Sequence, residues 1–183
     1  MKIRGIAFLG RKDNIIKSFG KLAWDKFESK LNVDIPYFKD EVLPLTLIPA
    51  EYFLHFQENL VSEFFGGEQE AYWIIGEASA ESSLINGPFK SYLPPNNIKE
   101  FAEKTLPLIA GRYFTEVSLK SVMNENNLQV TLHTPISHFY FEGTVFSYFK
   151  RALELASEKS VSFKKIKGCE GGNKDISYEY YFN

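Results

Sequence analysis

The fold is decided by the stretch that begins Gly143-Thr-Val-Phe-Ser-Tyr-Phe-Lys-Arg-Ala-Leu-Glu-Leu-Ala156, which predicts an amphipathic helix. Val161-Ser-Phe-Lys-Lys-Ile-Lys167 follows with alternating apolar residues and predicts a strand. A turn-rich link, Gly168-Cys-Glu-Gly-Gly-Asn-Lys-Asp175, leads into a second alternating strand, Ile176-Ser-Tyr-Glu-Tyr-Tyr-Phe182. A helix that runs into a β-hairpin needs an apolar layer to cover.

Upstream of this stretch the pattern is helical first and then alternating. Apolar residues at helical spacing predict helices over 14–31, 50–65, 68–79, 97–110 and 143–157. Alternation predicts a hairpin over 117–132 and a brief extended run at 139–141, and the apolar run 3–9 reads as a short strand or core segment. The sequence therefore predicts an α+β fold, with N-terminal helices followed by an antiparallel sheet of about four strands in the order strand-strand-helix-strand-strand.

Length and charge exclude several classes of protein. The 183 residues suit one domain over 1–183, and 44% of them are hydrophobic against 24% charged, which is ordinary for a globular protein. A net charge of −2 gives no basic face for nucleic acid. No apolar stretch approaches the length of an integral membrane segment.

Cysteine use indicates the compartment. Cys169 is the one cysteine and cannot form an internal disulfide, and the N-terminal apolar run is too short for a signal peptide. Together these features predict a reducing, cytoplasmic location.

The aromatic content is the unusual number, with 17 Phe and 10 Tyr. Aromatic side chains either fill a core or line a cavity between helices and sheet, and spacing alone leaves both possibilities open. If some of them line a pocket, the candidates for the lining are Trp73, Phe101, Tyr113, Tyr140 and Phe146. Arg112, His133 and His138 are candidates for polar groups at its mouth.

Two short segments carry a family resemblance. Gly5-Ile-Ala-Phe8, followed by Phe19-Gly20 and Trp24, resembles the opening of heme-nitric-oxide-binding (H-NOX) domains. The end, from Val161 through Cys169 to Tyr178-Glu-Tyr180, resembles the closing hairpin of 4-vinyl reductase (V4R) domains. Both families share one α+β fold with the Bet3-like subunits of the TRAPP complex. The resemblance implies a ligand held between the helices and the sheet.

The chain departs from the heme-binding pattern. The resemblance implies an axial histidine on a helix and a Tyr-x-Ser-x-Arg motif for the heme propionates. The helix expected at 97–110 has no histidine, and the motif does not occur. V4R domains often carry several cysteines, and this chain has one. We therefore expect no heme, no metal site and no other cofactor.

Catalytic patterns are weak. His133 and His138 flank a proline turn and would need further ligands to hold a metal, so ordinary hydrogen-bonding roles are favoured. Cys169 has no nucleophile signature around it and is expected to be a structural thiol. No catalytic residue is assigned, and the chain is predicted not to be an enzyme.

Three hypotheses follow. The first is a non-enzymatic small-molecule-binding or sensor domain, with an apolar pocket for a hydrophobic or amphipathic ligand such as a fatty acyl chain or a tetrapyrrole-like compound. The second is a protein–protein interaction module that forms a homodimer without a ligand. The third is an atypical heme-based gas sensor.

Overall fold

A four-stranded antiparallel sheet forms one side of the molecule. The computed structural model describes residues 1–93, 97–125 and 127–183. The order of the strands in the sheet is β3-β4-β6-β5. Their bounds are Ser118–Met123 for β3, Asn127–His133 for β4, Val161–Lys167 for β5 and Asp175–Phe182 for β6. The predicted α+β class, the hairpin near 117–132 and the C-terminal hairpin are confirmed.

Alternation places the apolar residues of the central strands on one face. Leu128, Val130 and Leu132 of β4 are fully buried, and their partners on β6 are Tyr180, Tyr178 and Ile176. Each partner is also buried, because side chains opposite one another in an antiparallel pair share a face. This face carries the helices, whereas most of β5 is exposed.

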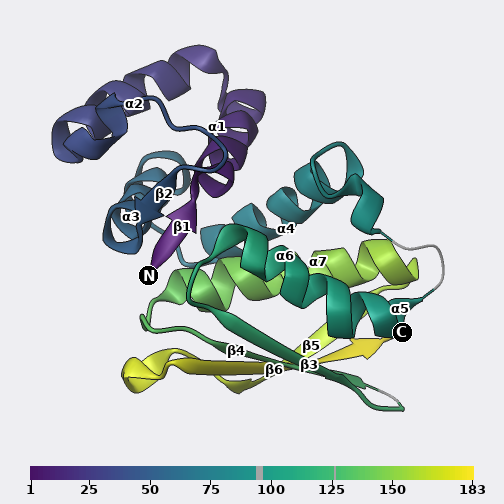
Figure 1. The fold of residues 1–183 in the computed structure, drawn as a ribbon. Coiled ribbons are helices and arrows are strands. Elements are labelled where there is room, and N and C mark those ends of the chain that lie inside the picture. Colours follow the sequence, from purple (N-terminus) through teal and green to yellow (C-terminus); the bar gives the residue numbers. More distant parts are fainter. Residues whose placement is uncertain (94–96, 126) are drawn as a thin grey trace.

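Helices cover that face in two layers (Figure 1). The elements nearest the sheet are η4 (Phe141–Val145), α7 (Phe146–Ser157), α5 (Ile98–Glu100), η3 (Phe101–Thr105) and α6 (Leu106–Tyr113). Helix α4, Glu70–Ile85, packs on α7 and η4 from the other side. Gly76 allows this close approach, because a Cβ at that position would overlap Ser147 Oγ and the Thr144 carbonyl oxygen. η3 and η4 are single π-helical turns, a feature that often marks a functional site.

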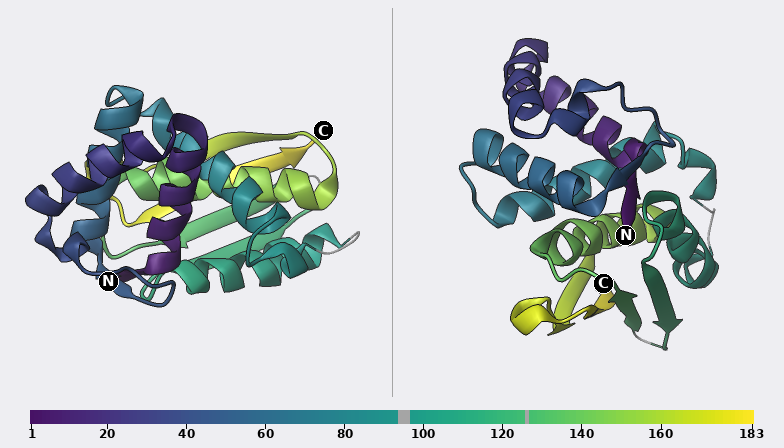
Figure 2. Two further views of the ribbon diagram at one scale, coloured as in Figure 1. Left: turned by 90° about the horizontal axis from the view of Figure 1, so that it is seen from above. Right: turned by 60° about the vertical axis from the view of Figure 1, so that its left-hand side comes forward.

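The N-terminal third forms a separate group of elements at the end of the molecule away from the sheet (Figure 2). Its elements are β1 (Lys2–Arg4), α1 (Gly5–Phe19), α2 (Lys21–Asp34), η1 (Pro36–Lys39), β2 (Leu47–Pro49) and α3 (Ala50–Phe65). Strands β1 and β2 pair through Ile3 and Ile48. The core is aromatic: the ring of Phe8 lies 4.9 Å from that of Phe38 and 4.8 Å from that of Phe56. Short turns η2 (Lys90–Tyr92) and η5 (Glu170–Gly172) complete the chain.

Several expected boundaries are wrong. The run 3–9 is strand only to Arg4, and α1 begins at Gly5. One helix was expected over 14–31, but Gly20 adopts a φ of +89°, and this ends α1 and starts α2 in a new direction. The run 139–141 is helical, not extended, because it leads directly into η4 and α7.

Two other helices also differ in extent from the expectation. The third helix extends beyond Ser79 to Ile85. The fourth helix is divided into α5, η3 and α6 and ends at Tyr113. Pro107 lies in the first turn of α6, where a proline is tolerated although it has no backbone N–H. The loop expected around residues 93–95 and the turn expected at 124–127 lie partly outside the described residues.

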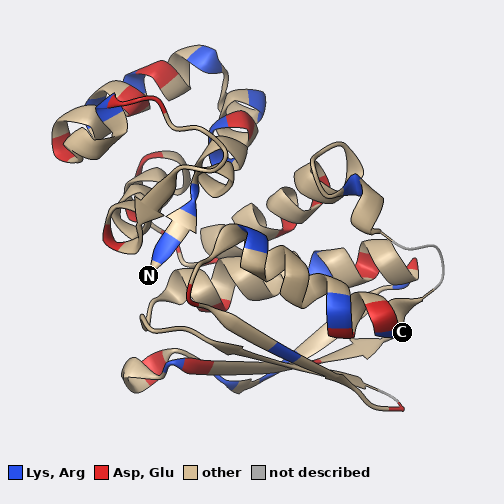
Figure 3. Cartoon of the chain, in the orientation of Figure 1, with Lys and Arg blue, Asp and Glu red and all other residues tan. Residues whose placement is uncertain are grey.

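Charge is distributed without a strong bias of sign. Lys and Arg alternate with Asp and Glu along α2 and over the helices above the sheet (Figure 3). Among the residues that the structure describes, none of the helices is long and apolar enough to cross a bilayer.

Candidate functional site

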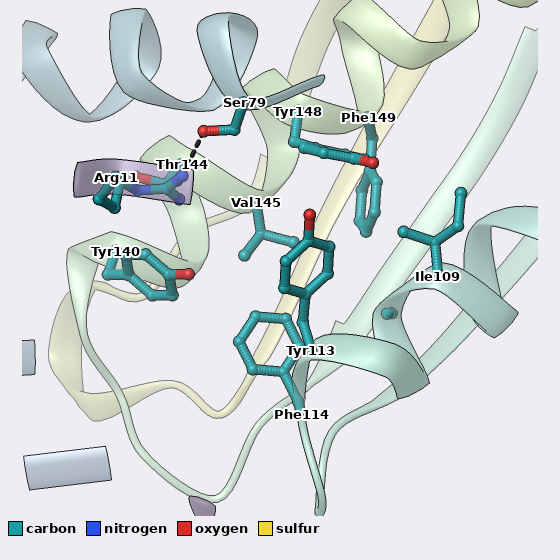
Figure 4. Close-up of a pocket in the computed structure, with 11 residues that line it drawn as sticks. Arg11, Ser79, Ile109, Tyr113, Phe114, Tyr140, Thr144, Val145, Tyr148 and Phe149 are labelled. Carbon is teal, nitrogen blue, oxygen red and sulfur yellow. Dashed lines mark hydrogen bonds between the residues drawn. The ribbon is translucent and has the colours of Figure 1, made fainter. Parts of the chain in front are cut away.

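The candidate site is a small cavity between α1, α4, α6 and the segment η4–α7, with a volume of about 30 Å³. That is room for about two water molecules. Its apolar lining comes from Ile109, Ala110, Phe114, Val145 and Phe149. Its polar lining comes from Arg11, Ser79, Tyr113, Tyr140, Thr144 and Tyr148 (Figure 4). The cavity is therefore an apolar space with one cation and five hydroxyl groups.

Arg11 is the charged member of the lining and is only 6% exposed. It lies on the buried stripe of α1, one turn from Ala7 and Phe8 and one turn from Ile15. Its Nε donates to Gln57 Oε1 over 3.3 Å, and its Nη1 donates to Ser79 Oγ. Both acceptors are neutral. No carboxylate in 1–93, 97–125 or 127–183 lies within 4.0 Å of the guanidinium.

Three tyrosines surround the space. In Figure 4, Tyr140 lies beside Arg11, and Tyr113 and Tyr148 lie on the other side of Val145. Burial raises the pKa of Tyr140 to about 12, although the nearby Arg11 acts in the opposite direction. Burial also raises the pKa of Tyr113, and that of Tyr148 still further. The three phenols are therefore neutral at physiological pH and can donate hydrogen bonds.

Hydroxyl groups on α4 and η4 are already engaged. Ser79 Oγ donates to the Ile75 carbonyl over 2.5 Å, which leaves its lone pairs for Arg11. Ser83 Oγ and the Tyr148 hydroxyl lie 2.9 Å apart. Thr144 Oγ1 donates to the Tyr72 carbonyl over 3.0 Å. These bonds fix the wall of the cavity that α4 and α7 share.

The structure brings two of the eight residues proposed from the sequence into this cavity, Tyr113 and Tyr140. Phe101 and Phe146 are fully buried in the core between the helices and the sheet. Trp73 does not line the cavity and stacks on Phe163 of β5 with ring centroids 5.0 Å apart. Arg112 is exposed on α6.

The two histidines proposed for the mouth of the pocket make ordinary polar contacts elsewhere. His133 Nδ1 lies 2.7 Å from Asp175 on the exposed end of the sheet. His138 Nε2 lies 3.1 Å from Glu58, and its Nδ1 accepts the Tyr140 N–H over 3.0 Å. Within the described residues, no group of three or more His, Cys, Asp or Glu is placed to hold a metal ion.

Cys169 lies in the link between β5 and β6, outside the cavity. Burial, and then its hydrogen bond with Glu142, raise the pKa of this thiol to about 11. The thiol is therefore protonated at neutral pH and a poor nucleophile. This agrees with the structural role expected from the sequence.

Arg11 and Ser79 were missed by the sequence analysis, and a signal for Arg11 exists. A charged residue on the apolar stripe of a helix needs an explanation, and Arg11 lies on the stripe formed by Ala7, Phe8 and Ile15. The expected helix began at residue 14, so Arg11 fell outside it. Ser79 carries no comparable signal.

Phe146→Trp tests the placement of Phe146 in the core. The Phe146 ring lies 4.5 Å from that of Tyr178 and 5.8 Å from that of Phe149. Because Phe146 is fully buried against these rings, the larger indole is expected to lower the free energy of unfolding by about 1–3 kcal/mol. Urea denaturation measures this change, and an unchanged midpoint would show that Phe146 borders a cavity.

No family model matches the chain, and no curated protein matches it. Solved structures do match it. It aligns with the protein from a study of heme redox potential and porphyrin distortion at a TM-score of 0.69 and 14% identity, over 98% of this chain and 95% of that one. An Fe(II) unliganded H-NOX protein from K. algicida aligns at a TM-score of 0.69 and 14% identity, over 98% of this chain and 96% of that one. An H-NOX protein from T. Tengcongensis aligns at a TM-score of 0.63 and 12% identity, over 94% of this chain and 93% of that one. The chain therefore has an H-NOX-like fold.

Proposed function

We propose that this chain is a non-enzymatic small-molecule-binding or sensor domain, and that the cavity beside Arg11 is its ligand site. The observation that carries the proposal is Arg11, a residue only 6% exposed, whose guanidinium lines a mainly apolar space and is bonded only to neutral groups among the described residues. A buried charge without a counter-charge is unfavourable, and proteins retain such groups mainly where they bind something. The H-NOX-like fold of the chain supports a ligand site, because its structural neighbours include a protein studied for its heme redox potential and an H-NOX protein in the Fe(II) unliganded state.

The arrangement favours binding over catalysis. Ser79 Oγ donates to a backbone carbonyl, so it is not poised to lose its proton to a base. The residues described as lining the cavity include no histidine, cysteine or carboxylate to act as that base. The hydroxyl groups and the guanidinium are suited to orienting a guest.

The position of Arg11 supports a sensor role. Helix α1 belongs to the N-terminal group of elements, whereas α6 and α7 lie on the sheet (Figure 1). A ligand that contacts Arg11 and the apolar wall of α6 and α7 would therefore bridge the two parts. Its binding would favour one arrangement of the two parts over others, and such a ligand-dependent shift between conformations is how a sensor domain responds.

Heme does not fit the cavity as it stands. A volume of about 30 Å³ is far below the 300–1,000 Å³ typical of organic ligand sites. The oxygen donors in the lining are phenols held in the neutral form by burial, whereas iron is bound by phenolate. A long acyl chain meets the same limit of volume. The site as described suits a guest of a few heavy atoms.

Native mass spectrometry of the purified protein, with a parallel hemin titration, tests the proposed function. We expect a monomer that gains the mass of a small ligand, and no Soret band that survives gel filtration. A dimer without ligand would favour the homodimer module. A stable Soret band that Tyr140→Phe or His138→Ala abolishes would favour the heme sensor.

A further inference from the structure

The chemistry of the cavity specifies the charge of its ligand. Arg11 bonds Gln57 through Nε and Ser79 through Nη1, and the Tyr140 hydroxyl also interacts with the guanidinium, so these three partners among the described residues are all neutral. A guanidinium has five N–H donors, so donors remain for a ligand. A guanidinium offers a planar fork of donors that matches a carboxylate. In a space of low dielectric, an anion beside it is stabilised far more than a neutral group of the same size.

Neutral phenols strengthen this preference. The hydroxyl groups of Tyr113 and Tyr140 line the same cavity as the guanidinium. A neutral phenol donates a hydrogen bond to an anion, while a phenolate would repel it. No acidic side chain lines this cavity among the residues that the structure describes.

Arg11 also lines a neighbouring surface hollow. A second, larger hollow of about 250 Å³ lies along α1 and the C-terminal end of α4, and it shares Arg11, Ser79 and Tyr113 with the cavity. Its other polar lining comes from Ser82, Ser83, Asn86 and Asp13. Asp13 is exposed, so its charge is solvated at the rim. Arg11 therefore stands at the junction of a polar surface hollow and an apolar cavity.

We propose, building on the function proposed above, that the site binds a short-chain monocarboxylate of about two to four carbons, with its carboxylate on Arg11 and its alkyl tail in the inner cavity. The apolar walls from Ile109, Val145 and Phe149 receive the tail. The volume of about 30 Å³ limits the length of that tail.

Isothermal titration calorimetry in chloride-free buffer provides the test, with butyrate and its neutral isostere butyramide as probes. We expect butyrate to bind and butyramide to bind at least tenfold more weakly. Arg11→Gln should weaken butyrate at least tenfold and bring its affinity close to that of butyramide. Lys12→Gln is the matched control, because Lys12 is the next residue on α1, pairs with Glu28 and does not line the cavity.

Two further measurements keep the result interpretable. Arg11→Gln removes a buried charge without a counter-charge, so the ligand-free variant should melt at a temperature no lower than the parent, which shows that it folds. Acetate, butyrate and octanoate are compared for chain length, and an affinity that keeps rising through octanoate would overturn the short-chain assignment.

The outcomes separate the two proposals. Equal binding of butyrate and butyramide, unaffected by Arg11→Gln, would overturn the carboxylate assignment and leave a small-molecule site standing. Binding of neither probe, together with no ligand mass in native spectra, would overturn both the carboxylate assignment and the proposed function.

Discussion

Glu142→Ala is expected to lower the free energy of unfolding by about 3 kcal/mol, because it removes the acceptor of three hydrogen bonds in the core. Glu142 is 2% exposed. Its Oε1 accepts from Lys165 Nζ and from the Tyr178 hydroxyl, each over 3.0 Å, and its Oε2 accepts the Cys169 N–H over 2.8 Å. Urea denaturation followed by tryptophan fluorescence measures the loss.

The large effect arises because the three donors belong to the C-terminal hairpin. Lys165 lies on β5, Tyr178 on β6 and Cys169 in the link between them, so one carboxylate of η4 ties the hairpin to the helical layer. Glu170→Gln is the matched control: Glu170 also bonds Lys165, but its side chain is 67% exposed. A change below about 1 kcal/mol is expected there. Equal effects of the two substitutions would contradict the assignment.

Acidification should remove the same contribution. Burial by itself raises the pKa of Glu142, but the hydrogen bonds from Cys169, Lys165 and Tyr178 outweigh it and hold the pKa below its ordinary value. A lowered pKa in the folded state stabilises the fold above the ordinary pKa of about 4.5 and ceases to do so as the pH falls through the folded-state value. The parent protein should therefore lose more stability than Glu142→Gln below about pH 4.5, as urea midpoints at several pH values would show.

The sheet was predictable because its signal is local. The alternation is complete in 176–182 and holds in 161–165, up to the irregularity between Lys165 and Lys167, and the intervening glycines mark the link. The start of α1 was not predictable in this way. Glycine has a low helix propensity, yet α1 begins at Gly5. Only glycine fits at this position, because a side chain there would overlap the Leu43 carbonyl. Tertiary packing therefore determines where α1 begins. Because the sequence analysis placed this start at residue 14, Arg11 was not recognised as part of a helix.

The site was only partly predictable for a related reason. Tyr113 and Tyr140 line the cavity, Phe146 fills the core and Trp73 lies near the edge strand, yet all four occupy similar apolar positions in the sequence. Whether an aromatic ring faces a cavity, the core or a neighbouring strand depends on how the helices cross. The crossing of α4 over η4 and α7 is one such determinant, and it depends on Gly76 and on Gly143, where an added Cβ would overlap Tyr72 of α4.

Gly76→Ala is expected to lower the free energy of unfolding by about 2–3 kcal/mol, although alanine favours a helix over glycine by about 1 kcal/mol. The added methyl group would overlap Ser147 Oγ and the Thr144 carbonyl oxygen, so α4 has to move away from α7. Ser79 lies one turn further along α4 and bonds Arg11, so the same movement should also weaken butyrate binding. Gly111→Ala is the matched control, because Gly111 lies in α6 and an added Cβ would meet no atom of a described residue within 4 Å outside its own turn of helix. It should raise stability by about 0.5–1 kcal/mol. Opposite signs for the two substitutions in urea denaturation would show that the α4–α7 approach, and not glycine content, sets the wall of the site, whereas stabilisation by both would contradict this.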